Sequence, residues 1–287
     1  MKFLTLSSGR RLAYYEYGDP SGVPTFYFHG WPSSGLQGSL MDEAGRELGL
    51  RIISPDRPGL GHSDFHPGRR LLDWPPVLSE MAEHLGFEKF HLIGVSGGGP
   101  YVLAASHALS DRVLSATTVC GAPPLKLFGT QDLFWPYRFV LVLRRHITCL
   151  MEPVFRVGEK ISRQNPNQVP MKLLIGMLNA RDQDVMRDEA KQQVIAEGFR
   201  QSIRQSVEHI QADADLYLED WGFDLSQIRV PIHMWHGRED RNIPFRYAEK
   251  LAALLPNVTP HWTDDDGHYS MAITRGRQVA LAALGRA

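Results

Sequence analysis

The sequence lacks the features that mark secreted, membrane-spanning and nucleic-acid-binding proteins. Its 287 residues include only two cysteines, Cys120 and Cys149, too few for a disulfide framework, and no paired Cys/His spacing indicates structural zinc. The net charge of −1 leaves no basic surplus for binding phosphates. Residues 1–9 lack the apolar run of about 7 to 15 residues of a secretory signal, and no apolar run reaches the roughly 20 residues of a membrane span. We therefore expect a cytoplasmic protein with a small-molecule partner, no nucleic-acid partner and no stable membrane insertion.

Short strand-like runs alternate along the chain with longer helical stretches. This alternation predicts an α/β fold with an eight-stranded, mostly parallel sheet flanked by helices. The first two runs lie close together and predict an antiparallel hairpin. The predicted strands span 2–6, 11–17, 25–28, 51–54, 90–95, 113–119, 231–235 and 258–263. The predicted helices span 40–48, 77–85, 100–108, 247–255 and the stretch from about 275 to the C-terminus.

The regular alternation stops after Pro123-Pro124 and resumes near Gln227. The intervening segment is helical in character, rich in methionine and charge, and without strand signals. We therefore predict a core domain of residues 1–124 and 227–287 with an inserted helical cap of residues 125–226. Aromatic and methionine side chains in the cap favour an apolar substrate, although such residues at helical spacing more often pack a helix against a core.

One motif carries a candidate nucleophile. Residues 90–95 form an apolar strand-like run, Gly94-Val95-Ser96-Gly97-Gly98 follows, and Pro100 suits a first helical turn. A serine between a strand and a helix projects from a tight turn, which small flanking residues such as Gly94 and Gly98 allow. The alternative is an ordinary glycine-rich loop that cradles a phosphate. Neither a dinucleotide fingerprint nor the Gly-Lys-Ser/Thr of a nucleoside-triphosphate loop is present.

Five segments, in this order, resemble the α/β-hydrolase family, in its serine-nucleophile branch with a helical cap. They are His29-Gly30-Trp31-Pro32, the stretch 55–63 (Pro-Asp-Arg-Pro-Gly-Leu-Gly-His-Ser), the serine motif, the stretch 236–244 (His-Gly-Arg-Glu-Asp-Arg-Asn-Ile-Pro) and Gly267-His268. The resemblance runs from about residue 3 to residue 284 and is weakest in the cap. We expect the stretch 55–63 to be chiefly structural, with Arg57 tying loops together.

The resemblance implies a catalytic serine, acid and histidine in that chain order, which are Ser96, Asp240 and His268 here. It also implies two backbone N–H donors for an oxyanion, from Trp31 and Gly97. The residues themselves agree, because Asp240 and His268 follow predicted strands whose carboxyl ends should meet at one edge of the sheet. No cofactor and no metal are implied.

Several alternatives stay open at this point. Glu239 adjoins Asp240 and could be the acid instead. His233 and His236 could be mistaken for a metal pair, but a spacing of three on a strand points them to opposite faces. The acidic run 264–266 favours a solvated turn over a catalytic pair.

The sequence favours a serine hydrolase that cleaves a carboxylic ester with a small or apolar acyl group through an acyl-enzyme. Relatives that open epoxides or remove halides carry Asp at the position of Ser96, which argues against both reactions. Hydrolysis of a carbon–carbon, amide or thioester bond, or perhydrolysis, would use the same three residues. A slow-turnover sensor of small ligands on the same fold is the alternative from another class.

Overall fold

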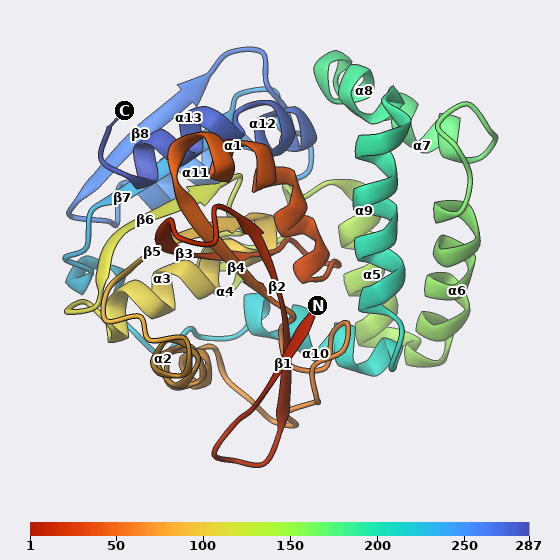
Figure 1. The fold of residues 1–287 in the computed structure, drawn as a ribbon. Coiled ribbons are helices and arrows are strands. Elements are labelled where there is room, and N and C mark those ends of the chain that lie inside the picture. Colours follow the sequence, from red (N-terminus) through yellow and green to blue (C-terminus); the bar gives the residue numbers. More distant parts are fainter. Residues whose placement is uncertain (287) are drawn as a thin grey trace.

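An eight-stranded sheet forms the centre of the protein, as the computed structural model of residues 1–286 shows (Figure 1). The spatial order of the strands is β1-β2-β4-β3-β5-β6-β7-β8, and all pairs beyond β2 and β4 are parallel. The predicted α/β fold and the antiparallel hairpin of β1 and β2 are therefore confirmed. The strands are β1 (Lys2–Thr5), β2 (Arg11–Gly18), β3 (Val23–Phe28), β4 (Leu50–Pro55), β5 (Phe90–Val95), β6 (Val113–Val119), β7 (Ile232–Gly237) and β8 (Val258–Thr263).

Burial along the strands follows their place in the sheet. Every residue of the central strand β5 is buried, because helices cover both faces of a parallel sheet. The last strand, β8, is at the edge and leaves Thr259 and Pro260 exposed. A proline has no N–H to donate to a neighbouring strand, so an edge strand is where it is tolerated.

Helices cover the sheet in two groups that enclose separate hydrophobic clusters. The larger cluster includes Leu78, Leu103 and Leu251, from helices α2, α3 and α11. The smaller cluster includes Ala44, Met271 and Ala280, from α1, α12 and α13 on the other face. These helices are α1 (Asp42–Leu48), α2 (Trp74–His84), α3 (Gly99–Ala108), α11 (Phe245–Ala252), α12 (His268–Thr274) and α13 (Gly276–Ala283), with 3-10 turns η1 (Gly35–Met41), η2 (Leu71–Asp73) and η3 (Ser96–Gly98).

The observed helices differ from the predicted ones in three places. The predicted helix 40–48 begins as the 3-10 turn η1 and becomes α-helical only at Asp42, where two acidic residues favour a helix N-terminus. Helix α12 was not predicted, because seven residues directly after a glycine give too little periodicity. The final predicted helix begins at Gly276 and ends at Ala283. Ala287, at the end of the predicted core domain, lies outside the described residues.

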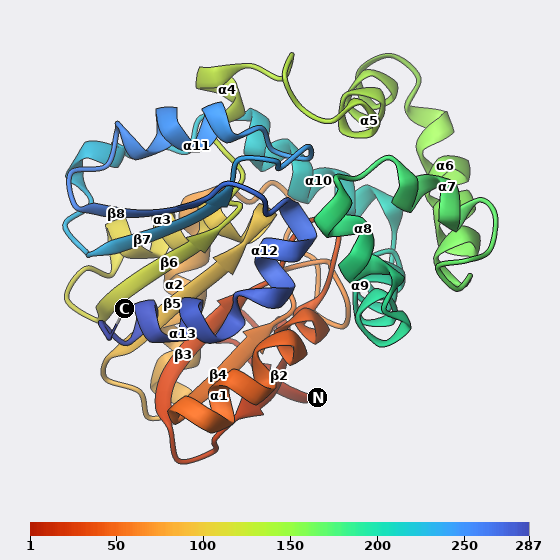
Figure 2. The same ribbon diagram turned by 90° about the horizontal axis from the view of Figure 1, so that it is seen from above.

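The segment between β6 and β7 is helical within the described residues and contains no strand. We call residues 125–226 the insert. Figures 1 and 2 show helices α5 to α9 gathered at one side of the sheet. Helix α10 lies closer, with Leu216 and Tyr217 packed into the larger core cluster. The insert contains α4 (Leu125–Phe128), α5 (Trp135–His146), α6 (Met151–Ser162), α7 (Met171–Gly176), α8 (Ala180–Arg187), α9 (Glu189–Ser202), α10 (Val207–Leu218), and the 3-10 turns η4 (Thr148–Leu150) and η5 (Leu225–Gln227), which ends just beyond it.

Within the described part of the chain, we find no helix that combines the length and the apolar character needed to span a membrane.

Candidate active site

Ser96 stands in a strained turn between β5 and α3. Its φ of 52° lies in the left-handed region, which a non-glycine residue rarely adopts. The turn leaves no room beside it: a Cβ on Gly98 would lie 2.1 Å from the Phe28 carbonyl oxygen, and one on Gly94 would lie 2.6 Å from the Gly98 carbonyl oxygen. The sequence prediction that these two glycines make space for the turn is therefore confirmed.

Asp240 and His268 meet beyond the ends of β7 and β8. The Asp240 carboxylate lies 2.8 Å from Nδ1 of His268, and both residues are buried. The other carboxylate oxygen of Asp240 accepts the backbone N–H groups of Asn242 and Ile243, at 2.8 and 2.9 Å. Glu239 is exposed. The structure thus brings Asp240, and not Glu239, against the imidazole.

His268 and Asp240 shift each other's pKa in the directions that favour a protonated imidazole next to an ionised carboxylate. Burial disfavours the imidazolium, but the charge and hydrogen bond of Asp240, with the charge of Asp182, together raise the pKa of His268 above its ordinary value. Burial also opposes ionisation of Asp240, yet the charge and hydrogen bond of His268 lower its pKa. Asp240 therefore stays ionised at neutral pH and fixes the proton on Nδ1, which leaves Nε2 free to accept one.

Trp31 and Gly97, the predicted backbone donors, lie side by side. A Cβ on Gly97 would stand 3.1 Å from the Trp31 backbone nitrogen. The Trp31 indole N–H donates to the Ile210 carbonyl oxygen at 3.0 Å, which ties this loop to α10 of the insert. The two amides therefore come from different strand ends but share one small region next to Ser96.

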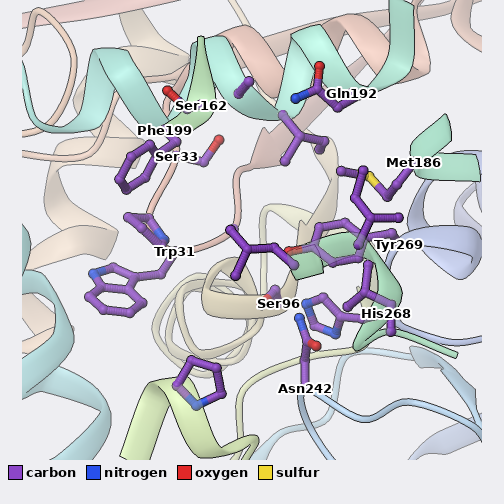
Figure 3. A pocket seen from close by; sticks show the side chains of 18 of the residues that line it. Trp31, Ser33, Ser96, Ser162, Met186, Gln192, Phe199, Asn242, His268 and Tyr269 are labelled. Atoms are coloured by element: carbon purple, nitrogen blue, oxygen red, sulfur yellow. The ribbon is translucent and has the colours of Figure 1, made fainter. Parts of the chain in front are cut away.

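Ser96 and His268 line a common cavity of about 400 Å³. Figure 3 shows both side chains at one end of it, with Asn242 beside them, and Ser162, Gln192 and Phe199 toward the other end. The insert supplies much of the wall, including Met171, Ile175, Met186 and Phe199. None of the described residues lining the cavity is Lys, Arg, Asp or Glu.

A buried ion cluster joins the insert to the Trp31 loop. Asp213 of α10 accepts from Arg57 at 2.8 Å and from Arg69, and all three side chains are almost completely buried. Arg57 also donates to the carbonyl oxygens of His29 and Gly30, directly before Trp31. The prediction that Arg57 ties loops together is confirmed. Its partner Asp213 was missed, because nothing in a helical segment marks one aspartate as buried.

Tyr217, one turn beyond Asp213 on α10, reaches the serine turn. Its hydroxyl lies 3.1 Å from both the Gly97 carbonyl oxygen and the Asp213 carboxylate. Burial raises the pKa of Tyr217 well above its ordinary value, so the hydroxyl stays protonated. The ion cluster therefore supports both peptide segments that carry the candidate oxyanion donors.

Asp182 of α8 holds the histidine segment in place. Its buried carboxylate accepts the backbone N–H groups of His268, Tyr269 and Ser270 at 2.9, 3.0 and 2.7 Å, which are the otherwise unpaired donors at the start of α12. Burial raises the pKa of Asp182 despite these hydrogen bonds. No local sequence pattern predicts this contact, because 86 residues separate Asp182 from His268.

The acidic run 264–266 is only partly the solvated turn that the sequence predicts. The side chain of Asp264 is 95% exposed, but that of Asp266 is fully buried. Asp266 pairs with Arg275 at 2.8 Å and with Arg181 of the insert at 3.0 Å. The prediction is wrong for Asp266, because two arginines compensate its burial.

One buried group of side chains has the spacing of metal ligands. Donor atoms of Cys120, His236 and Asp240 lie within 4.8 Å of one another. However, Nε2 of His236 lies 2.8 Å from the Ile243 carbonyl oxygen, so this nitrogen must carry a proton. The Asp240 oxygens are already engaged by His268 and two backbone amides. His233 faces His261 instead, at 3.0 Å, so these side chains form no metal centre with His236.

Comparisons with known proteins agree with this architecture. A model of the Alpha/beta hydrolase family matches residues 26–283. A non-heme chloroperoxidase from Streptomyces lividans is 25% identical over 272 residues, which cover 90% of each chain. A 2-hydroxy-6-oxononadienedioate/2-hydroxy-6-oxononatrienedioate hydrolase from Burkholderia vietnamiensis is 26% identical over 232 residues, which cover 79% of this chain and 73% of that protein. An esterase from Exiguobacterium antarcticum shares the fold, with a TM-score of 0.68 at 17% identity, over 99% of this chain and 97% of that chain.

The match of the family model covers nearly the whole chain and confirms the resemblance drawn from the five sequence segments. The protein belongs to the alpha/beta hydrolase family and is a hydrolase.

Proposed function

We propose that the protein hydrolyses a carboxylic ester through an acyl-enzyme on Ser96. The observation that carries this proposal is that three features meet around Ser96: its strained turn, an imidazole that lines the same cavity and is bonded to a buried carboxylate, and two adjacent backbone amides. A nucleophile, a base with its orienting acid, and donors for an oxyanion are the parts that acyl transfer needs.

In acylation, Ser96 Oγ attacks the ester carbonyl carbon while Nε2 of His268 takes the hydroxyl proton. The negative charge that develops on the carbonyl oxygen is stabilised by the backbone N–H groups of Trp31 and Gly97. The carbon–oxygen bond to the alcohol then breaks, and His268 gives its proton to the departing oxygen. Asp240 holds the imidazole in the productive tautomer and stabilises the imidazolium without itself taking the proton.

In deacylation, a water molecule replaces the alcohol. His268 takes one of its protons as the water oxygen attacks the acyl carbon, and returns that proton to Ser96 Oγ as the acyl–serine bond breaks. The products are a carboxylic acid and an alcohol, and the enzyme returns to its starting state. No redox change occurs and no cofactor takes part.

The insert acts in this proposal as a cap that shapes the substrate site. Methionine, isoleucine and phenylalanine side chains from α7, α8 and α9 face the cavity, so the substrate is largely apolar. Because none of the described lining residues is a lysine or arginine, a dianionic substrate would be buried without a partner, at a large cost in free energy. This favours a neutral ester over a dioate such as the one in the name of the Burkholderia relative.

Perhydrolysis is the second candidate function. It follows from a relative that is named a bifunctional esterase/perhydrolase, and it differs only in the second step, where hydrogen peroxide attacks the acyl-enzyme and releases a peroxy acid. Ester hydrolysis remains the primary proposal because the same acyl-enzyme serves both reactions and water is the more abundant nucleophile.

The direct test is labelling with a fluorophosphonate, followed by mass spectrometry of the adduct. We expect rapid stoichiometric labelling confined to Ser96, none in Ser96→Ala, and turnover of an activated ester that is lost in the same variant. A matched control is Ser106→Ala, a buried serine of α3 outside the cavity, which should label like the wild type. A folded protein that neither labels nor turns over esters would refute the proposal and favour the slow sensor.

A further inference from the structure

Two cavities meet at Ser96. The larger, of about 400 Å³, contains His268. The smaller, of about 70 Å³, lies on the side of Gly97 and is lined almost wholly by apolar atoms, with Leu125 and Leu133 among its walls. The residues lining both cavities are Trp31, Ser96 and Tyr137. An ester bound at Ser96 therefore has two unequal spaces for its two halves.

The chemistry of ester cleavage decides which half enters which cavity. In the tetrahedral intermediate the carbon carries the serine oxygen, the oxyanion, the leaving oxygen and the acyl substituent. His268 takes a proton from the serine oxygen and gives it to the leaving oxygen, so the alcohol must lie on the side of the imidazole. The acyl substituent takes the remaining direction, away from His268.

The imidazole of His268 lines the larger cavity and is absent from the described walls of the smaller one. His268 and its neighbours Tyr269 and Ala272 line the larger cavity. The described walls of the smaller cavity include Gly97, directly after the nucleophile, and Ile243, but no residue of α12. The larger cavity is therefore the side of the leaving alcohol.

The volumes then set the size of each half. A cavity of about 150 Å³ binds benzene, which has six carbon atoms, so 70 Å³ accommodates roughly three. The larger volume falls within the range of about 300 to 1,000 Å³ that holds a complete small ligand. A short acyl group fits the first space and a bulky alcohol the second.

We propose that the substrate is the short-chain ester of a large, uncharged, mainly apolar alcohol, with the acyl group in the smaller cavity and the alcohol in the larger. This proposal rests on the proposed ester hydrolysis and names its substrate class. Both halves are uncharged because neither cavity has Lys, Arg, Asp or Glu among its described walls.

A pair of isomeric esters tests the assignment on the unmodified protein. In 2-phenylethyl acetate the alcohol is bulky, whereas in methyl 3-phenylpropanoate, of the same formula, the acyl group is bulky. We expect kcat/KM for the acetate to exceed that for the methyl ester by about 10-fold or more, since one misplaced methylene already costs a factor of that order. Equal values, or the opposite preference, would overturn the assignment.

Two matched variants test which cavity limits the acyl chain. Leu133→Ala enlarges the smaller cavity, and Met186→Ala enlarges the larger one; both side chains are buried. With 2-phenylethyl esters from acetate to octanoate, we expect activity in the wild type to fall beyond about four acyl carbons. Leu133→Ala should raise the octanoate-to-acetate ratio of kcat/KM about 10-fold, and Met186→Ala should leave that ratio unchanged. A rise in Met186→Ala alone would place the acyl chain in the larger cavity.

The labelling of Ser96 separates this proposal from the one on which it rests. Protein that labels at Ser96 and hydrolyses both isomers, but prefers the bulky acyl group, would refute the substrate class and leave ester hydrolysis standing. Protein that does not label would refute ester hydrolysis itself. The isomer pair needs no variant, so a folding defect in Leu133→Ala does not remove the test.

Discussion

Replacing Asp213 with asparagine should destabilise the protein far more than the same change two residues further along the same helix. Asp213 is fully buried and bridges two buried arginines, Arg57 and Arg69, with further contacts from the Tyr101 and Tyr217 hydroxyls at 2.6 and 3.1 Å. Asp213→Asn keeps the shape of the side chain but leaves both guanidinium groups without a counter-charge.

The magnitude follows from that burial. Breaking a buried ion pair by removing one partner costs about 3 to 5 kcal/mol, because the remaining charge is desolvated and unpaired. For 287 residues, with an unfolding entropy of about 2.1 cal/mol/K per residue, this loss corresponds to a fall in Tm of about 5 to 8 °C. In the control variant Asp215→Asn, the lost partner is Arg144 at 2.9 Å, and both side chains are about one-third exposed. Such a pair contributes only about 0.2 to 1 kcal/mol.

The assay is urea unfolding at pH 7, followed by tryptophan fluorescence, with wild type and both variants in parallel. A lower midpoint with an unchanged slope would report a change in stability alone. Burial opposes ionisation of Asp213, but Arg57 and Arg69 lower its pKa well below the ordinary value. The stabilisation is therefore fully present above about pH 5 and is lost only in strong acid, as the pH falls through the folded-state pKa. Equal, small losses in the two variants, or a difference that disappears near pH 6, would refute this reasoning.

Three further predictions concern catalysis. Asp240→Asn should lower kcat for an ester by about 10⁴-fold, because the His268 tautomer with its proton on Nδ1 is no longer held. Glu239→Gln should stay near wild type, since Glu239 is exposed. The reverse ranking in steady-state kinetics would move the acid role to Glu239. Asp182→Asn removes a charge that raises the pKa of His268, so the variant's His268 should have a lower pKa. Because His268 must be neutral to act as a base, the acid limb of the pH profile of kcat/KM should move to lower pH. An acid limb that stays in place would contradict this. Gly97→Ala puts a Cβ 2.6 Å from the hydroxyl of Tyr217, so the backbone N–H of residue 97, a candidate oxyanion donor, is displaced. We expect kcat to fall by about 10²- to 10³-fold. An unchanged circular dichroism spectrum would show that the fold is intact.

The sheet and the serine turn were predictable because their determinants are local. Strands 90–95, 113–119 and 258–263 have the bounds that their strand-like runs predict. The strained φ of Ser96 could be anticipated because its causes lie within a dozen residues. A strand precedes the serine, a helix starts directly after it, and glycines stand on both sides of it. Once the parallel strands are placed, the carboxyl ends of β7 and β8 must lie at the same edge, which brings Asp240 toward His268.

The supports of the site were not predictable, because they depend on contacts across the chain. In α8, Asp182 is buried at the start of α12, whereas the side chain of Asp184 is 72% exposed. In α10, Asp213 is buried between two arginines, whereas the side chain of Asp215 is about one-third exposed. Within each pair, both residues are the same amino acid in the same helix.

The sequence by itself therefore determined the order of the elements, the turn that presents Ser96, and the loops that hold Asp240 and His268. Only the tertiary structure decided which acidic residues of the insert support those loops, and how two cavities divide the space around the serine. The physical reason is that a strand, a turn or a cap is set by neighbours a few residues away. By contrast, the burial of an aspartate is set by whether arginines or backbone amides from distant segments surround it.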